Sequence, residues 1–247
     1  MPFHPDQLLL YAVTDRAWTG RQTLLEQLEA ALQGGVTLVQ LREKDLDPAA
    51  FLAEALEVKA LCRRYHVPLI LNDQVDLALA CGADGVHVGS EDLPVAHIRR
   101  QAGPDFIIGA TAKTVQQAQA AQAAGANYLG VGAVFPSPTK PGAQRLTPEE
   151  LGGICASVSI PAVAIGGIGP SNLAQLKGSG AAGIAVVSSL FGAEDIQAAA
   201  QALADILRRA QEEPESLHAA PVSTVVGRPD ETAAARHPVV RYSFPEA

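Results

Sequence analysis

The stretch Gln-Leu-Arg-Glu-Lys at residues 40–44 decides how this chain is interpreted. It follows the apolar run at residues 36–39, which is typical of a buried β-strand. Because alternate side chains of a strand point to the same face, Gln40, Arg42 and Lys44 are expected to share one face where the strand ends. An arginine fork and a lysine ammonium both suit phosphate groups. The stretch therefore predicts a strand leading into an anion-binding site, with a solvated strand end as the alternative.

Short apolar runs and longer helical patterns alternate along the chain as far as residue 211. The expected strands cover residues 8–14, 37–41, 68–71, 85–89, 106–110, 128–134, 161–165 and 183–187. The expected helices cover residues 21–33, 48–65, 75–80, 94–101, 114–124, a segment that starts at 147, 171–177 and 194–211. Asp47 and the Thr147–Glu150 pattern are expected to cap two of these helices.

Regular alternation of strands and helices predicts a parallel sheet covered by helices. Eight pairs within about 210 residues favour a single (β/α)8 TIM barrel of the α/β class, although such barrels are usually somewhat larger. The runner-up is a doubly wound open sheet. It is disfavoured because no G-x-G-x-x-G motif follows the first expected strand. The predicted catalytic domain is therefore a barrel over residues 1–211.

Residues 212–247 differ in composition from the rest of the chain. They contain prolines at 214, 221, 229, 238 and 245 and have no helical periodicity. This pattern predicts a Pro-rich, flexible C-terminal extension outside the barrel.

Charge and cysteine content narrow the class of protein. A net charge of −8 argues against nonspecific binding to nucleic acid or to an anionic membrane surface. Cys62, Cys81 and Cys155 show no metal-binding spacing, so reduced thiols and a cytoplasmic location are expected. Neither a signal segment nor a membrane span is expected. The sequence leaves the oligomeric state open, and a homo-oligomer is compatible with it.

Polar residues or glycines follow every expected strand, and in a TIM barrel these strand ends form the active-site face. The candidates are Asp15 and Arg16, then Gln40, Arg42 and Lys44, Asn72 and Asp73, Ser90, Glu91 and Asp92, Thr111 and Lys113, Ser137, Thr139 and Lys140, Gly166 and Gly167, and Ser188 and Ser189. Each set alone could be ordinary loop chemistry. Their convergence on one rim predicts a binding site.

Two carboxylates, Asp73 and Asp92, follow neighbouring strands. Mg²⁺ prefers one or two carboxylates together with phosphate oxygens, so this pair predicts a magnesium site. Helix capping by each aspartate is the alternative.

Glycines and hydroxyl groups follow the last strands. Gly166 and Gly167, with Ser188, match the phosphate site common in barrels, where backbone N–H groups hold the anion. The loop at residues 137–140 adds two hydroxyl groups and a cation. Together with the anion site at residues 40–44, this arrangement predicts two phosphorylated substrates held face to face. Tyr11, Trp18 and His87 are expected to serve packing, with His87 in the core or at its rim.

The ordered set of motifs over roughly residues 8–210 resembles the thiamine phosphate synthase family. The matching pieces are YAVTD at 11–15, QLREK at 40–44, ND at 72–73, ADGVHVG at 83–89 with ED at 91–92, IGAT at 108–111, GVGAVFPSPTK at 130–140 and AIGGI at 164–168. The resemblance implies a transferase that joins a hydroxymethylpyrimidine diphosphate to a thiazole phosphate. The products are thiamine phosphate and pyrophosphate.

The resemblance also implies a role for each site residue. The pyrimidine diphosphate would be held by Gln40, Arg42, Lys44, Asn72, Thr111 and Lys140. The thiazole phosphate would be held by Ser137, Thr139, Gly167, Val187 and Ser188. Asp73 and Asp92 would bind Mg²⁺. Arg42, Lys44 and Lys140 would be the catalytic cations, because they stabilise charge on the pyrophosphate as it leaves in a dissociative displacement.

Three positions depart from the family pattern. Thr111 replaces the usual serine and Ser137 the usual threonine, so both keep a hydroxyl group, whereas Lys113 stands where histidine is frequent. Two other functions remain open. A thiazole tautomerase on the same fold would not need the metal and diphosphate residues, and a non-catalytic protein that binds phosphate ligands would release no pyrophosphate.

Overall fold

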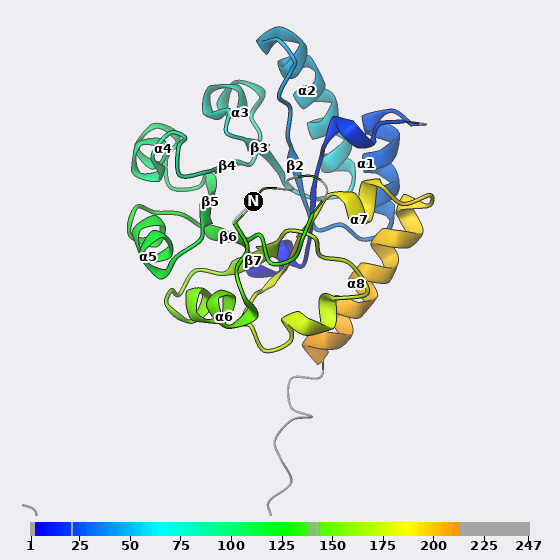
Figure 1. The fold of residues 1–247 in the computed structure, drawn as a ribbon. Helices are drawn as coiled ribbons and strands as arrows, with labels where there is room; N and C mark the ends of the chain where they lie inside the picture. The colour runs from blue at the N-terminus through cyan, green and yellow to red at the C-terminus, as the bar shows by residue number, and fades with distance from the viewer. Residues whose placement is uncertain (1–2, 21, 138, 140–141, 143, 213–247) are drawn as a thin grey trace, which may run out of the picture. The chain divides into compact units, whose positions relative to one another are not determined.

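The strands of the protein form a closed barrel in which each strand pairs with its sequence neighbours and β1 pairs with β8 (Figure 1). The computed structural model describes residues 3–20, 22–137, 139, 142 and 144–212. All eight strand pairings are parallel. The strands are β1 (Leu10–Val13), β2 (Leu38–Leu41), β3 (Leu69–Asn72), β4 (Gly85–Val88), β5 (Ile107–Ala112), β6 (Tyr128–Gly132), β7 (Ala162–Ile165) and β8 (Gly183–Val186). The predicted TIM barrel is confirmed and the open sheet is excluded.

The helices surround the strands as a ring in Figure 1. They are α1 (Leu24–Gln33), α2 (Pro48–Arg64), α3 (Val75–Cys81), α4 (Val95–Ala102), α5 (Val115–Ala123), α6 (Pro148–Ala156), α7 (Ser188–Phe191) and α8 (Ile196–Glu212). Three short 3-10 helices are η1 (Pro5–Leu8), η2 (Arg16–Trp18) and η3 (Leu173–Leu176). Within the described residues, no helix has both the length and the apolar character needed to cross a membrane. The predicted extension lies outside the described residues from position 213 onward.

Helix ends follow the expected capping chemistry. The Asp47 carboxylate accepts hydrogen bonds from the first backbone N–H groups of α2, and Thr147 and Glu150 form a capping box at α6. The helix predicted from residue 21 begins only at Leu24, because Thr23 caps it. The helix predicted at 171–177 is the single 3-10 turn η3, which follows the left-handed Gly167 and the Asn172 turn. Helix α7 has no counterpart among the expected helices.

The barrel has two hydrophobic layers separated by the sheet. The larger layer packs the helices onto the outside of the strands, as Leu28, Val58 and Leu203 do. The smaller layer fills the barrel interior and includes Leu8, Tyr11 and Tyr128, with Phe3 packed against it. This interior layer supports the polar residues that the strands present at their C-terminal ends.

The Arg99 side chain ties together the connections on the opposite, N-terminal face of the barrel. Its guanidinium donates to the carbonyls of Gly103 at 2.8 Å, Phe106 at 2.6 Å and Gly125 at 2.8 Å, and to the Asn127 side chain at 2.6 Å. Because Arg99→Met leaves these acceptors without their charged donor, we expect the free energy of unfolding to fall by about 2–3 kcal/mol.

Denaturant unfolding of Arg99→Met measures this change, and Arg100→Met is the matched control. Arg100 is the exposed neighbour on the same helix, so its replacement should change stability by no more than about 0.5 kcal/mol. Equal losses in the two variants would contradict the structural role given to Arg99.

Candidate active site

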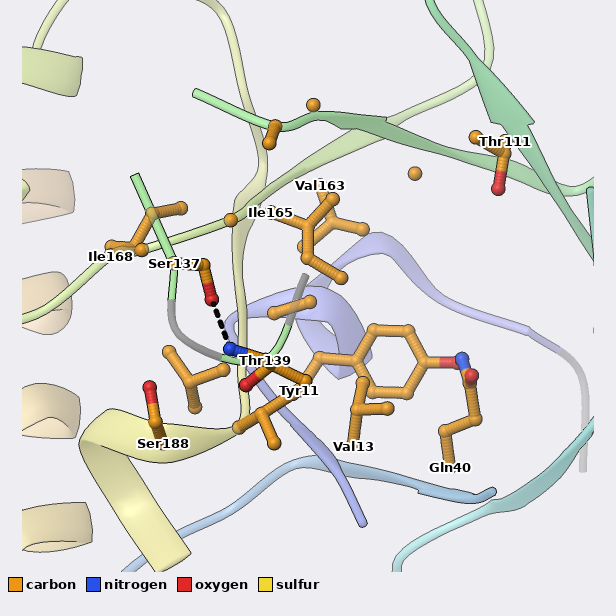
Figure 2. Close-up of a pocket in the computed structure, with 18 of the residues that line it drawn as sticks. Tyr11, Val13, Gln40, Thr111, Ser137, Thr139, Val163, Ile165, Ile168 and Ser188 are labelled. Carbon is orange, nitrogen blue, oxygen red and sulfur yellow. Dashed lines mark hydrogen bonds between the residues drawn. The ribbon is translucent and has the colours of Figure 1, made fainter. Parts of the chain in front are cut away.

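A cavity of about 670 Å³ opens at the C-terminal ends of the strands (Figure 2). Nine of the thirteen residues that were given a substrate or metal role line it: Gln40, Arg42, Asn72, Thr111, Ser137, Thr139, Gly167, Val187 and Ser188. Lys140 lies outside the described residues. Lys44, Asp73 and Asp92 are not part of the lining. The structure therefore brings most of the predicted residues, which are far apart in sequence, to one mouth.

Arg42 is held in place by residues at the end of β1. The Arg42 backbone N–H donates to Thr14 Oγ1 at 2.9 Å, and Arg42 Nη1 lies 3.2 Å from Asp15 Oδ2. The other oxygen of Asp15 caps η2 by accepting from the Ala17 N–H. Asp15 thus orients the guanidinium that faces the cavity, a role that the sequence interpretation did not assign to it.

Lys44 departs from the face that it was expected to share with Gln40 and Arg42. β2 ends at Leu41, so strand alternation no longer fixes the residues beyond it, and Lys44 is exposed outside the cavity lining. The Glu43 side chain is only 2% exposed and accepts from Arg16 Nε at 2.6 Å. Burial raises the pKa of Glu43. This ion pair anchors the loop that carries Lys44.

Asp73 and Asp92 form a close pair at the rim beside Asn72. Burial, together with the hydrogen bond and the negative charge of Asp92, raises the pKa of Asp73 to about 6. Asp73 has a φ of 60°, an uncommon conformation for a non-glycine residue that concentrates at functional sites. Asn72 Nδ2 donates to Asp73 Oδ2 at 2.5 Å, and the Gly89 N–H donates to Asp92 Oδ2 at 2.7 Å.

This carboxylate pair fits a divalent cation. Neither aspartate caps a helix: the residue before α3 is Gln74 and the residue before α4 is Pro94. Two carboxylates that lie close together repel each other, and a divalent cation between them relieves this repulsion. They are therefore a donor set suited to Mg²⁺, which completes its coordination with water or phosphate oxygens. The alternative of helix capping is therefore wrong for both residues.

The opposite wall of the cavity presents backbone and hydroxyl groups. Gly167 adopts a left-handed φ of 61°, and a Cβ there would clash with the Pro136 backbone, so glycine is required. The Asn172 side chain fixes this loop by donating to the Gly167 carbonyl at 2.8 Å. Ser188 lines the wall, and Thr139 Oγ1 is buried with no hydrogen-bond partner among the described residues. These groups suit a phosphate.

The cavity floor contains two residues that were expected only to pack, Tyr11 and His87. Both line the cavity, and Figure 2 shows the Tyr11 hydroxyl against the Gln40 amide. Burial raises the pKa of Tyr11 well above its ordinary value and lowers that of His87 to about 4. Trp18 packs against the outer layer, as expected. Polar residues at inward-facing strand positions were the signal that could have identified Tyr11 and His87.

All three positions that depart from the family pattern, Thr111, Lys113 and Ser137, line the cavity. Thr111 Oγ1 lies 3.1 Å from His87 Nε2, and exposed Lys113 adds a cation to the lining. The cavity as a whole is lined by Arg42 and Lys113 and by the hydroxyl groups of Ser137, Thr139 and Ser188, and the carboxylate pair lies beside Asn72 at its rim. Such a site can hold two anionic ligands next to each other.

Comparisons with known proteins agree on one family. The family model for thiamine monophosphate synthase matches residues 10–190. The thiamine-phosphate synthase of Ruminiclostridium cellulolyticum is 49% identical over 197 residues, which cover 80% of this chain and 94% of that protein. The thiamine-phosphate synthase of Lacticaseibacillus paracasei is 48% identical over 196 residues, covering 79% of this chain and 92% of that protein.

A solved structure agrees with these sequence matches. The thiamine phosphate pyrophosphorylase from Pyrococcus furiosus superposes with a TM-score of 0.77 at 37% identity. The match covers 83% of this chain and 98% of that one.

Proposed function

The chain belongs to the thiamine monophosphate synthase family, and on that premise we propose how its cavity performs the transfer. The reaction joins 4-amino-2-methyl-5-hydroxymethylpyrimidine diphosphate to 4-methyl-5-(2-phosphooxyethyl)thiazole and gives thiamine phosphate and pyrophosphate. The observation that carries this proposal is one cavity lined both by the cations Arg42 and Lys113 and by the hydroxyl groups of Ser137, Thr139 and Ser188. Each set would take the anionic group of one substrate.

The pyrimidine diphosphate would lie against the ends of β2, β3 and β5. Arg42, preset by Asp15, would bind phosphate oxygens through its fork. The proposed residues for this substrate are Gln40, Arg42, Lys44, Asn72, Thr111 and Lys140. Lys113 would add a further positive charge to this wall.

The thiazole phosphate would lie against the ends of β6, β7 and β8. Buried Thr139 Oγ1 has its hydrogen-bonding capacity available for a phosphate oxygen. The proposed residues for this substrate are Ser137, Thr139, Gly167, Val187 and Ser188. The thiazole nitrogen would then face the pyrimidine methylene carbon.

We propose a dissociative displacement that needs no nucleophile from the protein. The bond between the methylene carbon and the diphosphate oxygen breaks, and its electron pair leaves with pyrophosphate. The lone pair of the thiazole nitrogen then forms the new C–N bond to the pyrimidine methylene cation. Arg42, Lys44 and Lys140 would stabilise the negative charge that grows on the leaving oxygen, which is the main contribution required of the protein.

Asp73 and Asp92 would hold Mg²⁺ at the rim. When bound, the ion would neutralise charge on the diphosphate. The Gly89 N–H and the Asn72 amide orient the two carboxylates and so preset the site for the ion.

One assay tests the proposed reaction and separates it from the alternatives. Purified protein is given both phosphorylated precursors, with Mg²⁺ and with a chelator, while thiamine phosphate and pyrophosphate are measured. We expect equal amounts of the two products, dependent on Mg²⁺. Isomerisation of the thiazole precursor alone would indicate a tautomerase. Binding of both precursors with no product would indicate a non-catalytic phosphate-binding protein.

We also propose that residues 1–211 form the catalytic domain and that 212–247 are dispensable for the reaction. All eight strands and every described cavity residue precede residue 190. Deleting residues 212–247 is therefore expected to leave kcat/KM within about twofold of the full chain, because every described cavity group is retained. Loss of most of the activity, with the barrel's far-UV circular dichroism unchanged, would give the segment a catalytic role.

The proposed location is the cytoplasm. Cys62, Cys81 and Cys155 are all free thiols, and the first two are buried. Free thiols of this kind are usual in a reducing compartment.

A further inference from the structure

A continuous chain of hydrogen bonds crosses the cavity floor and joins two residues of the proposed pyrimidine site. Gln40 Nε2 donates to Tyr11 Oη at 2.7 Å, and Tyr11 Oη lies 2.7 Å from Tyr128 Oη. Tyr128 Oη lies 3.1 Å from His87 Nδ1, and His87 Nε2 lies 3.1 Å from Thr111 Oγ1. These hydrogen bonds therefore link strands β2, β1, β6, β4 and β5. Their two ends, Gln40 and Thr111, both line the cavity.

Two glycines provide the space for this chain. A Cβ on Gly109 would lie 2.5 Å from His87 Nδ1 and would also clash with the Tyr128 ring. A Cβ on Gly130 would lie 2.9 Å from His87 Cε1. Any larger residue at either position would displace the imidazole. The absence of side chains at Gly109 and Gly130 therefore leaves room for the His87 ring in its observed position.

The direction of each hydrogen bond follows from donor counting. The Gln40 amide nitrogen can only donate, so the Tyr11 oxygen accepts there and has its own proton left for Tyr128. Tyr128 in turn has its proton left for His87 Nδ1. If the order were reversed, the buried Tyr11 proton would have no acceptor in the chain. Because Nδ1 accepts from Tyr128 in this order, only Nε2 carries a proton, and the ring donates from that nitrogen alone.

We propose that His87 is a positioning residue that, as the Nε2–H tautomer fixed by Tyr128, makes Thr111 a hydrogen-bond donor to the pyrimidine diphosphate. Nε2–H donates to the Thr111 oxygen, which leaves the hydroxyl proton free to point into the cavity. Thr111 would then select a substrate atom that accepts, either a phosphate oxygen or a ring nitrogen. This inference rests on the proposed function, because it names the atom type that the same site recognises.

Paired substitutions of His87 separate positioning from packing. In His87→Gln the longer side chain keeps an amide donor near the place of Nε2, whereas in His87→Asn the amide lies near the place of Nδ1 and cannot reach Thr111. We expect His87→Asn to lower kcat/KM about 10- to 100-fold and His87→Gln to lose less than about tenfold. His97→Gln, at an exposed histidine of α4, is the control and should match the parent protein.

A double-mutant comparison tests whether His87 acts through Thr111. We expect Thr111→Val to lower kcat/KM by a factor similar to that of His87→Asn, and the double variant to be no worse than the more impaired single variant. The proposal would be overturned if the losses of kcat/KM in the two single variants multiplied in the double variant, or if His87→Gln and His87→Asn lost equal amounts. Either result would assign His87 to packing.

Nitrogen-15 NMR of the histidine side chains tests the tautomer without any substrate. The His87 signals are identified by their absence in His87→Gln. We expect a pyridine-type Nδ1 and a pyrrole-type Nε2 in the parent protein, and a mixed pair of signals in Tyr128→Phe, which lacks the fixing hydroxyl. A pyrrole-type Nδ1 in the parent protein would overturn the proposal even if the synthase reaction is observed. Absence of the synthase reaction with the expected tautomer would instead refute the proposed function.

Discussion

Replacing Arg42 by glutamine is expected to lower kcat/KM about 10²- to 10³-fold while the barrel stays folded. Glutamine keeps much of the length of the side chain but removes the charge and the fork that would bind the leaving diphosphate. It also removes the ion pair with Asp15, which is partly exposed and therefore contributes little to stability. Steady-state kinetics with the pyrimidine diphosphate varied, and thermal unfolding of the same sample, measure both effects.

Arg64→Gln is the matched control for Arg42→Gln. Arg64 pairs with Glu29 at 2.7 Å on the outer surface, and its side chain is 62% exposed. Its kinetics should equal those of the parent protein. Asp15→Asn tests the orienting role separately: it leaves the Arg42 charge in place and should cause a smaller loss than Arg42→Gln. Unchanged kinetics in Arg42→Gln would remove Arg42 from the proposed mechanism.

Asp92→Asn is expected to lower kcat about 10²- to 10³-fold at a fixed, moderate Mg²⁺ concentration. Asparagine is nearly isosteric, and its side-chain oxygen can still accept from the Gly89 N–H, so the loop should keep its shape. What is lost is one of the two carboxylates that would bind the cation. The Mg²⁺ concentration for half-maximal rate should therefore rise, and high Mg²⁺ should restore part of the activity.

The neighbouring Glu91→Gln is the control for charge alone. Glu91 is exposed, and its carboxylate lies 3.3 Å from Ser90 Oγ. The substitution Glu91→Gln therefore removes one negative charge from the same loop and leaves Asp73 and Asp92 in place. Its Mg²⁺ dependence should equal that of the parent protein. Equal shifts in Asp92→Asn and Glu91→Gln would mean that general electrostatics, rather than coordination, connects this loop to the metal.

The barrel could be predicted from the sequence because the pattern that indicates it is local and recurs along the chain. Each strand is a short apolar run followed by a polar residue or glycine, and the order of elements leaves few topologies for a parallel sheet. The same logic placed Arg42, Asn72, Thr111 and Ser188 at one mouth. Lys44 was expected there too, but it does not line the cavity, because β2 ends at Leu41 and strand alternation no longer applies beyond it.

The residue roles that could not be predicted from the sequence depend on contacts between strands that are distant in sequence. Tyr11 and His87 looked like packing residues because nothing near them in sequence shows the hydroxyl groups that they meet across the barrel. Asp15 was expected at the active-site face, but its orienting role was not, because its partner Arg42 follows another strand. The short helices η3 and α7 depend on loop conformation, which local periodicity does not encode.

The interior cluster of the barrel has a consequence for engineering heat resistance. Tyr11 and Tyr128 belong at once to that cluster and to the hydrogen-bonded floor, so a library that redesigns the inside of the barrel also alters ligand recognition. The outer layer, with Leu28 and Leu203, is separated from the mouth by the sheet itself. Mutations intended to raise the melting temperature should therefore be confined to the outer layer, where they can stabilise the barrel without changing the residues that contact substrate.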